Sequence, residues 1–167
     1  TVNGRAAEWL CAPGADATRV LLYLHGGGYV MGSPNTHRAL AGELSRAAQA
    51  RVLLPDYRLA PEAPFPAAVD DARAAYEWLL AQSGEGQRLA IAGDSAGGGL
   101  TVATLIALRD HGVALPRCAV CLSPWSDLAC SNASYHTSAA ADPMITSAAI
   151  SLMSRTYMSG VDSHAPL

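Results

Sequence analysis

The residues best suited to chemistry in this chain lie around Ser95, in a G-x-S-x-G motif. The motif directly follows an apolar run, residues 89–92, and directly precedes a segment of helical character. A serine on such a strand-to-helix turn is held in a strained backbone conformation, with its hydroxyl exposed at the carboxyl edge of a sheet. Gly93 and Gly97 let the strand and the helix approach closely, and the N–H of Ala96 points at charge that develops near the hydroxyl. The motif therefore predicts Ser95 as a nucleophile.

Three other interpretations of this turn differ in how well they fit its residues. A glycine-rich turn with an incidental serine has the same sequence pattern, so the motif alone leaves that alternative open. A phosphate-binding P-loop is excluded, because no Gly-Lys-Ser/Thr follows the turn. The dinucleotide fingerprint G-x-G-x-x-G also fails, because position 95 is Ser.

A second glycine-rich segment, His25-Gly-Gly-Gly, also follows an apolar run, residues 20–24. Successive glycines leave backbone N–H groups unobstructed and allow conformations that are closed to other residues. A serine acyl transfer needs such donors for its tetrahedral oxyanion, and each is worth about 3 kcal/mol of barrier. We therefore expect an oxyanion site in this loop. His25 is expected to brace the loop as a structural residue and not to act as the catalytic base.

The elements that must position these segments alternate between strand and helix. Such alternation predicts an α/β fold with a mostly parallel sheet and helices on both faces. The expected strands are residues 20–24, 51–54, 89–92 and 118–122, and the opening residues 1–19 can add an edge strand. The expected helices are residues 36–48, 66–82 and 96–110, with a short helix to residue 157 that Thr146 or Ser147 could cap.

Three segments together resemble the bacterial esterases of the hormone-sensitive-lipase family: HGGGY from His25, DYRLAPEAPFPA from Asp56 and GDSAGG from Gly93. Those proteins are α/β hydrolases with a helical cap, and the similarity runs from about residue 20 to the end of the chain. The resemblance implies hydrolysis of short- to medium-chain carboxylic esters through an acyl-enzyme on a serine, with no metal or cofactor. Residues 126–165 would then be a cap-related or connecting segment.

The same resemblance implies a role for each site residue. Ser95 would be the nucleophile. The oxyanion donors would be Gly26, Gly27 and Gly28 from the first loop, together with Ala96 after the serine.

Several charged residues near the motifs are expected to be structural. Asp56, Arg58 and Glu62 lie in the proline-rich stretch, which is a structural loop in the family pattern. Asp94 adjoins the serine but is expected to point away from it, because neighbours on a turn rarely share a face. Asp127 is expected to fix a loop.

The nucleophile also needs a base and an orienting acid. In α/β hydrolases these follow the serine in the order acid, then His. His111, His136 and His164 follow it here, and we reject each. His111 closes the helix after the motif, His136 lies in a loop, and His164 has no strand to position it. The triad acid and His are therefore expected outside this chain. Residues 1–167 are predicted to be a partial α/β-hydrolase domain of a polypeptide on the order of 300 residues, with an N-terminal cap also outside it.

Composition limits the partners. The net charge is −3 without a basic stripe, and no apolar stretch is long enough to span a bilayer, so neither nucleic acid nor membrane is an expected partner. A small ester is the expected partner, and a homodimer is left open. Of the four cysteines, Cys118 and Cys121 form a CxxC on a predicted strand, where they point to opposite faces and suit no shared metal. Buried free thiols are expected, in keeping with a cytoplasmic location.

Two further functions fit the same motifs. A ligand-binding protein on this scaffold that has lost its base would keep both glycine-rich segments. An amidase or deacetylase would use the same nucleophile and oxyanion donors on another acyl compound.

Overall fold

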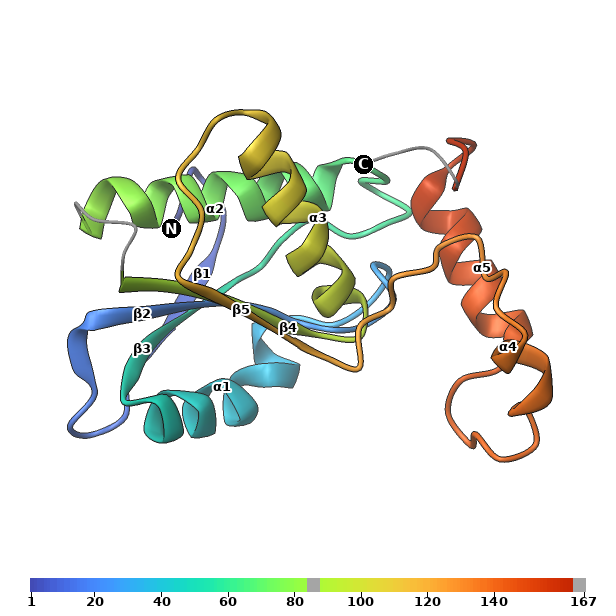
Figure 1. The fold of residues 1–167 in the computed structure, drawn as a ribbon, viewed down its shortest axis with the longest axis horizontal. Helices are drawn as coiled ribbons and strands as arrows, with labels where there is room; N and C mark the ends of the chain where they lie inside the picture. The colour runs from blue at the N-terminus through green and yellow to red at the C-terminus, as the bar shows by residue number, and fades with distance from the viewer. Residues whose placement is uncertain (84–87, 164–167) are drawn as a thin grey trace.

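A computed structural model describes residues 1–83 and 88–163, which form a five-stranded sheet covered by helices (Figure 1). The strand order is β1-β3-β2-β4-β5; the edge strand β1 pairs antiparallel with β3, and the other pairs are parallel. The predicted edge strand within residues 1–19 is therefore present. The strands are β1 (Ala7–Leu10), β2 (Asp16–Leu24), β3 (Ala50–Pro55), β4 (Leu89–Asp94) and β5 (Cys118–Leu122).

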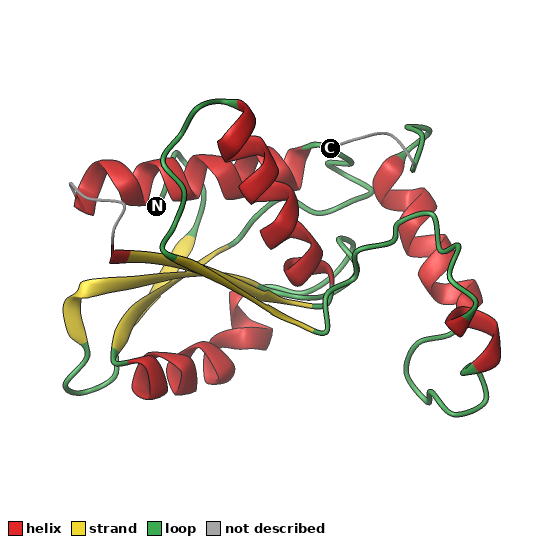
Figure 2. Ribbon diagram, viewed as in Figure 1, coloured by secondary structure: helices red, strands yellow, loops and turns green. Residues whose placement is uncertain are grey.

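Helices lie on both faces of this sheet, which confirms the predicted fold class. One face carries α1, the opposite face carries α2 and α3, and α4 and α5 lie beyond the carboxyl ends of the strands (Figures 1 and 2). No helix in the described residues is long and apolar enough to cross a membrane. The helices are α1 (Pro34–Ala48), α2 (Ala67–Ser83), α3 (Ala96–Asp110), α4 (Ser134–Thr137) and α5 (Ser147–Met158).

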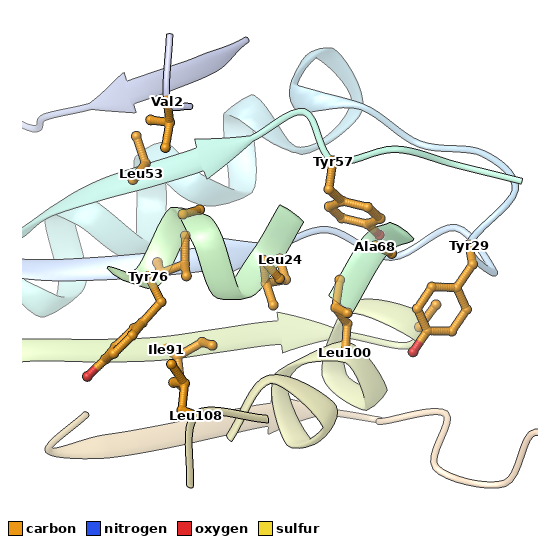
Figure 3. Packing of buried hydrophobic residues seen from close by; sticks show 14 of the residues in the cluster. Val2, Leu24, Tyr29, Leu53, Tyr57, Ala68, Tyr76, Ile91, Leu100 and Leu108 are labelled. Atoms are coloured by element: carbon orange, nitrogen blue, oxygen red, sulfur yellow. The ribbon is translucent and has the colours of Figure 1, made fainter. Parts of the chain in front are cut away.

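The core has two layers because successive side chains of a strand point to opposite faces. In β2, Leu22 and Leu24 belong to the cluster that also contains Tyr76 of α2 and Leu100 of α3. Figure 3 shows Leu24, Tyr76 and Leu100 in this cluster. The intervening Leu21 and Tyr23 join the smaller cluster under α1. Strand β2 begins at Asp16, four residues before the predicted start, and this added part is exposed and mostly polar. The apolar pattern therefore located only the buried part of the strand.

The face under α1 is covered incompletely. Next to α1 lies an apolar cavity of about 300 Å3, lined in part by Ala92, Cys118, Val120 and Leu122. Val120 is 49% exposed and Leu122 is 39% exposed, so β5 lacks the cover that its apolar sequence leads one to expect. The prediction of buried thiols is wrong for the same reason, since the free thiol of Cys118 on this strand is exposed.

The other cysteines differ from that prediction too. Cys11 is exposed, whereas Cys121 and Cys130 are half-buried, and all are free. The two cysteines of the CxxC do point to opposite faces: Cys118 lines the apolar cavity, and Cys121 Sγ donates a weak hydrogen bond to the carbonyl of Gly98 in α3.

Beyond the carboxyl ends of the strands, α5 packs on the loop that follows β2. Thr146 caps its N-terminus by accepting a hydrogen bond from the N–H of Ala149. Near its other end, the ring of Tyr157 stacks on Tyr29 at a centroid separation of 3.9 Å, and Phe65 meets it edge-on. This aromatic contact ties α5 to the loop that contains the consecutive glycines.

Arg58 and Asp127, two of the charged residues assigned to structure, have structural partners. The guanidinium of Arg58 holds Asp71 of α2 through two hydrogen bonds of 2.7 and 2.9 Å, which anchors the proline-rich loop. Asp127 Oδ2 accepts N–H groups of Ser131 and Asn132, so it fixes the loop after β5, as the sequence predicted. Hydrogen bonding to these donors outweighs partial burial and lowers the pKa of Asp127.

Candidate active site

Ser95 occupies a sharp turn between β4 and α3. Its backbone angles, φ 52° and ψ −119°, lie in a region that non-glycine residues rarely adopt. Two backbone hydrogen bonds hold the turn: the N–H of Ser95 donates to the carbonyl of Leu122 at 2.9 Å, and its own carbonyl accepts from Trp125 at 2.8 Å. The strained conformation is therefore fixed by the last residue of β5 and by the segment that follows this strand.

Close backbone packing explains the glycines on either side of this serine. A Cβ at Gly93 would overlap the carbonyl of Gly97. A Cβ at Gly97 would lie 2.5 Å from the carbonyl oxygen of His25, and it would overlap the carbonyl of Leu24 as well. The start of α3 therefore rests directly against the backbone that leads into the glycine loop, which we define as residues 25–28.

The glycine loop has a conformation that requires glycine. Gly27 and Gly28 have φ of 127° and 64°, and the N–H of neither donates a hydrogen bond within the described residues. A Cβ at Gly27 would overlap the carbonyl of Met31, and one at Gly28 would overlap Sδ of Met153 in α5. These two N–H groups are therefore left free in a loop whose backbone is closely surrounded.

Gly26 differs from the other two glycines, and its predicted role needs correction. Its N–H donates to Oδ1 of Asp94 at 3.0 Å, so this N–H is already engaged and is not a free oxyanion donor. A Cβ at Gly26 would in turn overlap the Asp94 carboxylate. The candidate oxyanion donors are thus reduced to Gly27, Gly28 and Ala96.

The side chain of His25, the first residue of this loop, is fully buried. Its Nδ1 is 2.8 Å from the carbonyl oxygen of Gly26, and because that oxygen can only accept, Nδ1 carries the proton. Its ring stacks on Tyr57 at 4.3 Å, and Nε2 has no hydrogen-bond partner among the described residues. Burial lowers the pKa of His25, so the ring is held neutral. These contacts suit a brace for the loop.

Asp94 joins three elements through its carboxylate. It follows Ala90 and Ala92 on the face of β4 that α1 covers, and its Oδ1 accepts the hydroxyl of Tyr23 at 2.8 Å as well as the N–H of Gly26. Its Oδ2 lies 3.4 Å from Nε2 of His37 in α1. Burial, and to a smaller extent the hydrogen bond from its hydroxyl to Asp94, raises the pKa of Tyr23, so the phenol remains a donor.

Sequence reasoning expected Asp94 to point away from the serine but did not find its partners. The alternation of side chains along β4 could have placed the carboxylate on the α1 side. Tyr23 and His37 gave no such signal, because one is 71 residues from Asp94 and the other is 57.

The remaining histidines have no hydrogen bond to Ser95 within the described residues, or lie outside those residues. His111 caps the far end of α3, with Nδ1 2.7 Å from the carbonyl oxygen of Ala107. His136 lies in α4, and His164 is outside the described residues. Across residues 1–83 and 88–163, no hydrogen bond involves Oγ of Ser95, and no cluster of His, Cys, Asp or Glu could hold a metal ion.

A family model described as "alpha/beta hydrolase fold" matches residues 21–167. The chain belongs to this family. An acetyl-hydrolase of Streptomyces hygroscopicus is 51% identical to this α/β hydrolase over 167 residues, which are 100% of this chain and 56% of that protein. The chain therefore spans about half the length of this relative.

Two solved structures are similar to this α/β hydrolase along nearly its whole length. The esterase EstE5, in crystals soaked with p-nitrophenyl butyrate, has a TM-score of 0.96 and 57% identity, covering 99% of this chain and 56% of that one. An esterase of the bacterial hormone-sensitive lipase family has a TM-score of 0.96 and 52% identity, with the same coverage. The predicted resemblance to that family is thereby confirmed.

Proposed function

We propose that the intact protein is a serine carboxylesterase in which Ser95 forms an acyl-enzyme with the ester. One observation carries the proposal: Ser95 is held at a positive φ directly between a buried strand and a helix, against a loop with free N–H groups. A serine hydroxyl free of other hydrogen bonds, beside unpaired backbone donors, is the arrangement that acyl transfer requires.

The first half of the reaction forms an ester on the enzyme. Oγ of Ser95 attacks the carbonyl carbon of the substrate and gives its proton to a base. The carbonyl oxygen becomes an oxyanion, which accepts hydrogen bonds from the N–H groups of Gly27, Gly28 and Ala96. When the tetrahedral intermediate collapses, the bond to the leaving alkoxide breaks, and the base returns the proton to it as alcohol. The N-terminus of α3 adds a favourable dipole at the oxyanion.

The second half restores the serine. Water attacks the acyl carbonyl, gives a proton to the base, and displaces Oγ, which recovers that proton as the carboxylic acid forms. No described histidine contacts Ser95 through a hydrogen bond. We therefore propose that the base and its orienting acid come from the remainder of the intact protein, in keeping with the length of the relatives.

Short acyl chains are the proposed substrates. The similar proteins include an acetyl-hydrolase, and EstE5 crystals were soaked with a butyrate ester. In this chain, Met153 of α5 lies against Gly28, and the stacked Tyr29 and Tyr157 stand beside it. These side chains crowd the loop where an acyl group would lie. We propose that they favour acetyl to butyryl groups over long chains.

The test combines labelling with turnover on the intact protein. A fluorophosphonate should react with the wild-type protein, and mass spectrometry should locate the adduct on Ser95. The wild type should hydrolyse p-nitrophenyl acetate and butyrate faster than the octanoate, and Ser95→Ala should lose this activity. A folded wild-type protein that is neither labelled nor faster than Ser95→Ala would instead be a binding protein. Faster cleavage of the matching anilides than of the esters would indicate an amidase.

A further inference from the structure

The carboxylate of Asp94 connects the turn that carries Ser95 to the glycine loop, and the proposed reaction needs these two segments in a fixed relative position. It belongs to the residue immediately before Ser95, and it binds the N–H of Gly26 in the glycine loop at 3.0 Å. We propose that Asp94 is a positioning residue, which aims the Gly27 N–H at the oxyanion by fixing Gly26 relative to the nucleophile. This inference rests on the proposed serine-ester chemistry.

The two peptide groups that flank Gly26 are fixed from opposite sides. The N–H of Gly26 belongs to the peptide before it and is held by Asp94. The carbonyl of Gly26 belongs to the peptide after it and is held by Nδ1 of His25 at 2.8 Å. That second peptide also carries the N–H of Gly27. Restraining both groups therefore restrains the two dihedral angles of Gly26 and, with them, the direction of the Gly27 N–H.

A glycine loop needs such restraint more than other loops do. Glycine has the widest choice of backbone conformations, so an unrestrained loop would spread its N–H groups over many directions. Preorganised donors contribute to an oxyanion site because they need no reorientation when charge develops. Asp94 is the residue immediately before Ser95. Its hydrogen bond to the N–H of Gly26 therefore fixes the position of the glycine loop relative to the nucleophile.

The contacts of the carboxylate show which of its properties the role requires. Oδ1 accepts both the hydroxyl of Tyr23 at 2.8 Å and the N–H of Gly26, whereas Oδ2 faces Nε2 of His37 at 3.4 Å. The amide oxygen of an asparagine could accept the same two donors as Oδ1. A glutamate would keep the charge but carry its oxygens one methylene farther, into the tight contact with Gly26. Geometry, and not charge, is therefore the property that positions the loop.

The experiment compares Asp94→Asn, Asp94→Glu and Asp94→Ala in the intact protein with p-nitrophenyl butyrate as substrate. Removing an oxyanion donor lowers kcat by about 100- to 1,000-fold, so misdirecting one should lower it by roughly 10- to 100-fold. We expect this loss of kcat in the Ala and Glu variants, with KM changed less than about 3-fold. Asp94→Asn should keep most of the wild-type kcat. Affinity for a trifluoromethyl ketone, whose adduct is an oxyanion, should fall in parallel with kcat.

Asp110→Ala is the matched control, because Asp110 is an exposed carboxylate at the opposite end of α3, paired with Arg109. Its kcat should equal that of the wild type. Thermal unfolding identifies any variant that fails to fold. If the Ala variant fails to fold, the comparison of the Asn and Glu variants still tests the proposal. If kcat of Asp94→Asn were as low as that of Asp94→Glu, or lower, the proposal would be overturned, because the charge of the carboxylate would then be the required property. A wild type no faster than Ser95→Ala would instead refute the proposed esterase itself.

Discussion

Replacing Gly97 by alanine tests whether close backbone contact, and not motif membership, requires glycine at the start of α3. The new Cβ would lie 2.5 Å from the carbonyl oxygen of His25 and 2.7 Å from its carbon, and it would overlap the carbonyl of Leu24. Real Cβ atoms essentially never approach within 3.0 Å of such atoms. The helix must therefore move by at least about 0.5 Å from the glycine loop, and by more from β2.

The magnitude follows from what surrounds the site. Overpacking a well-packed core costs about 1–3 kcal/mol, and backbone atoms on two elements cannot rotate aside as a side chain can, so we expect about 3 kcal/mol for Gly97→Ala. Helix propensity acts in the opposite direction, since alanine is favoured over glycine by about 0.5–1 kcal/mol within a helix. Gly42 in α1 isolates that term, because a Cβ there meets nothing within 4 Å.

The assay is urea unfolding of the intact protein, combined with the rate of fluorophosphonate labelling. Gly42→Ala should raise the free energy of unfolding by about 0.5–1 kcal/mol and leave labelling unchanged. Gly97→Ala should lower the free energy and slow labelling by about 100-fold, because displacement of the reacting groups by about 1 Å has that effect. Equal stability of the two variants, with Gly97→Ala labelled at the wild-type rate, would refute the reasoning.

Three further outcomes are expected. Burial lowers the pKa of His25, so as the pH falls the unfolded chain takes up the proton first, and stability present above about pH 6.5 is lost. In urea titrations, His25→Asn should flatten this pH dependence of the free energy of unfolding. An unchanged pH dependence in that variant would contradict the reasoning. Tyr157→Ala should cost about 3–5 kcal/mol by removing the stack on Tyr29, and limited proteolysis should then cut near α5, whereas an uncut helix would argue against the stack as its anchor. Residues 1–167 expressed alone should enhance anilinonaphthalene sulfonate emission through the apolar face of β5, and Val120→Lys should reduce it; equal emission from both would place the dye elsewhere.

The fold was accessible from sequence because the central parallel strands are largely buried on both faces. Apolar runs such as residues 20–24 and 89–92 have few other structural interpretations when helical segments alternate with them. The start of β2 at Asp16 was missed because prediction relied on apolar residues. This part of the strand pairs with β3 at Ala50, but its side chains are exposed. Burial of β5 was expected from its apolar residues, yet burial depends on what packs against a strand.

The candidate site was predictable in type but not in its connections. Three consecutive glycines indicate free N–H groups, yet only the fold reveals that the N–H of Gly26 is taken by Asp94. Tyr23 and His37 could not be assigned to that carboxylate, because their contacts join positions far apart in the sequence. Met153 likewise reaches Gly28 only through the packing of α5.

The sequence by itself determined the strand-turn-helix that carries Ser95 and the glycine loop after the preceding parallel strand, because both depend on local backbone chemistry. Glycine is needed wherever φ is positive or two backbones meet, and such positions leave a readable pattern. The tertiary structure decided which N–H groups remain free and which carboxylate holds Gly26 in place. Hydrogen bonds between distant segments follow from how the elements pack, and no local pattern encodes them.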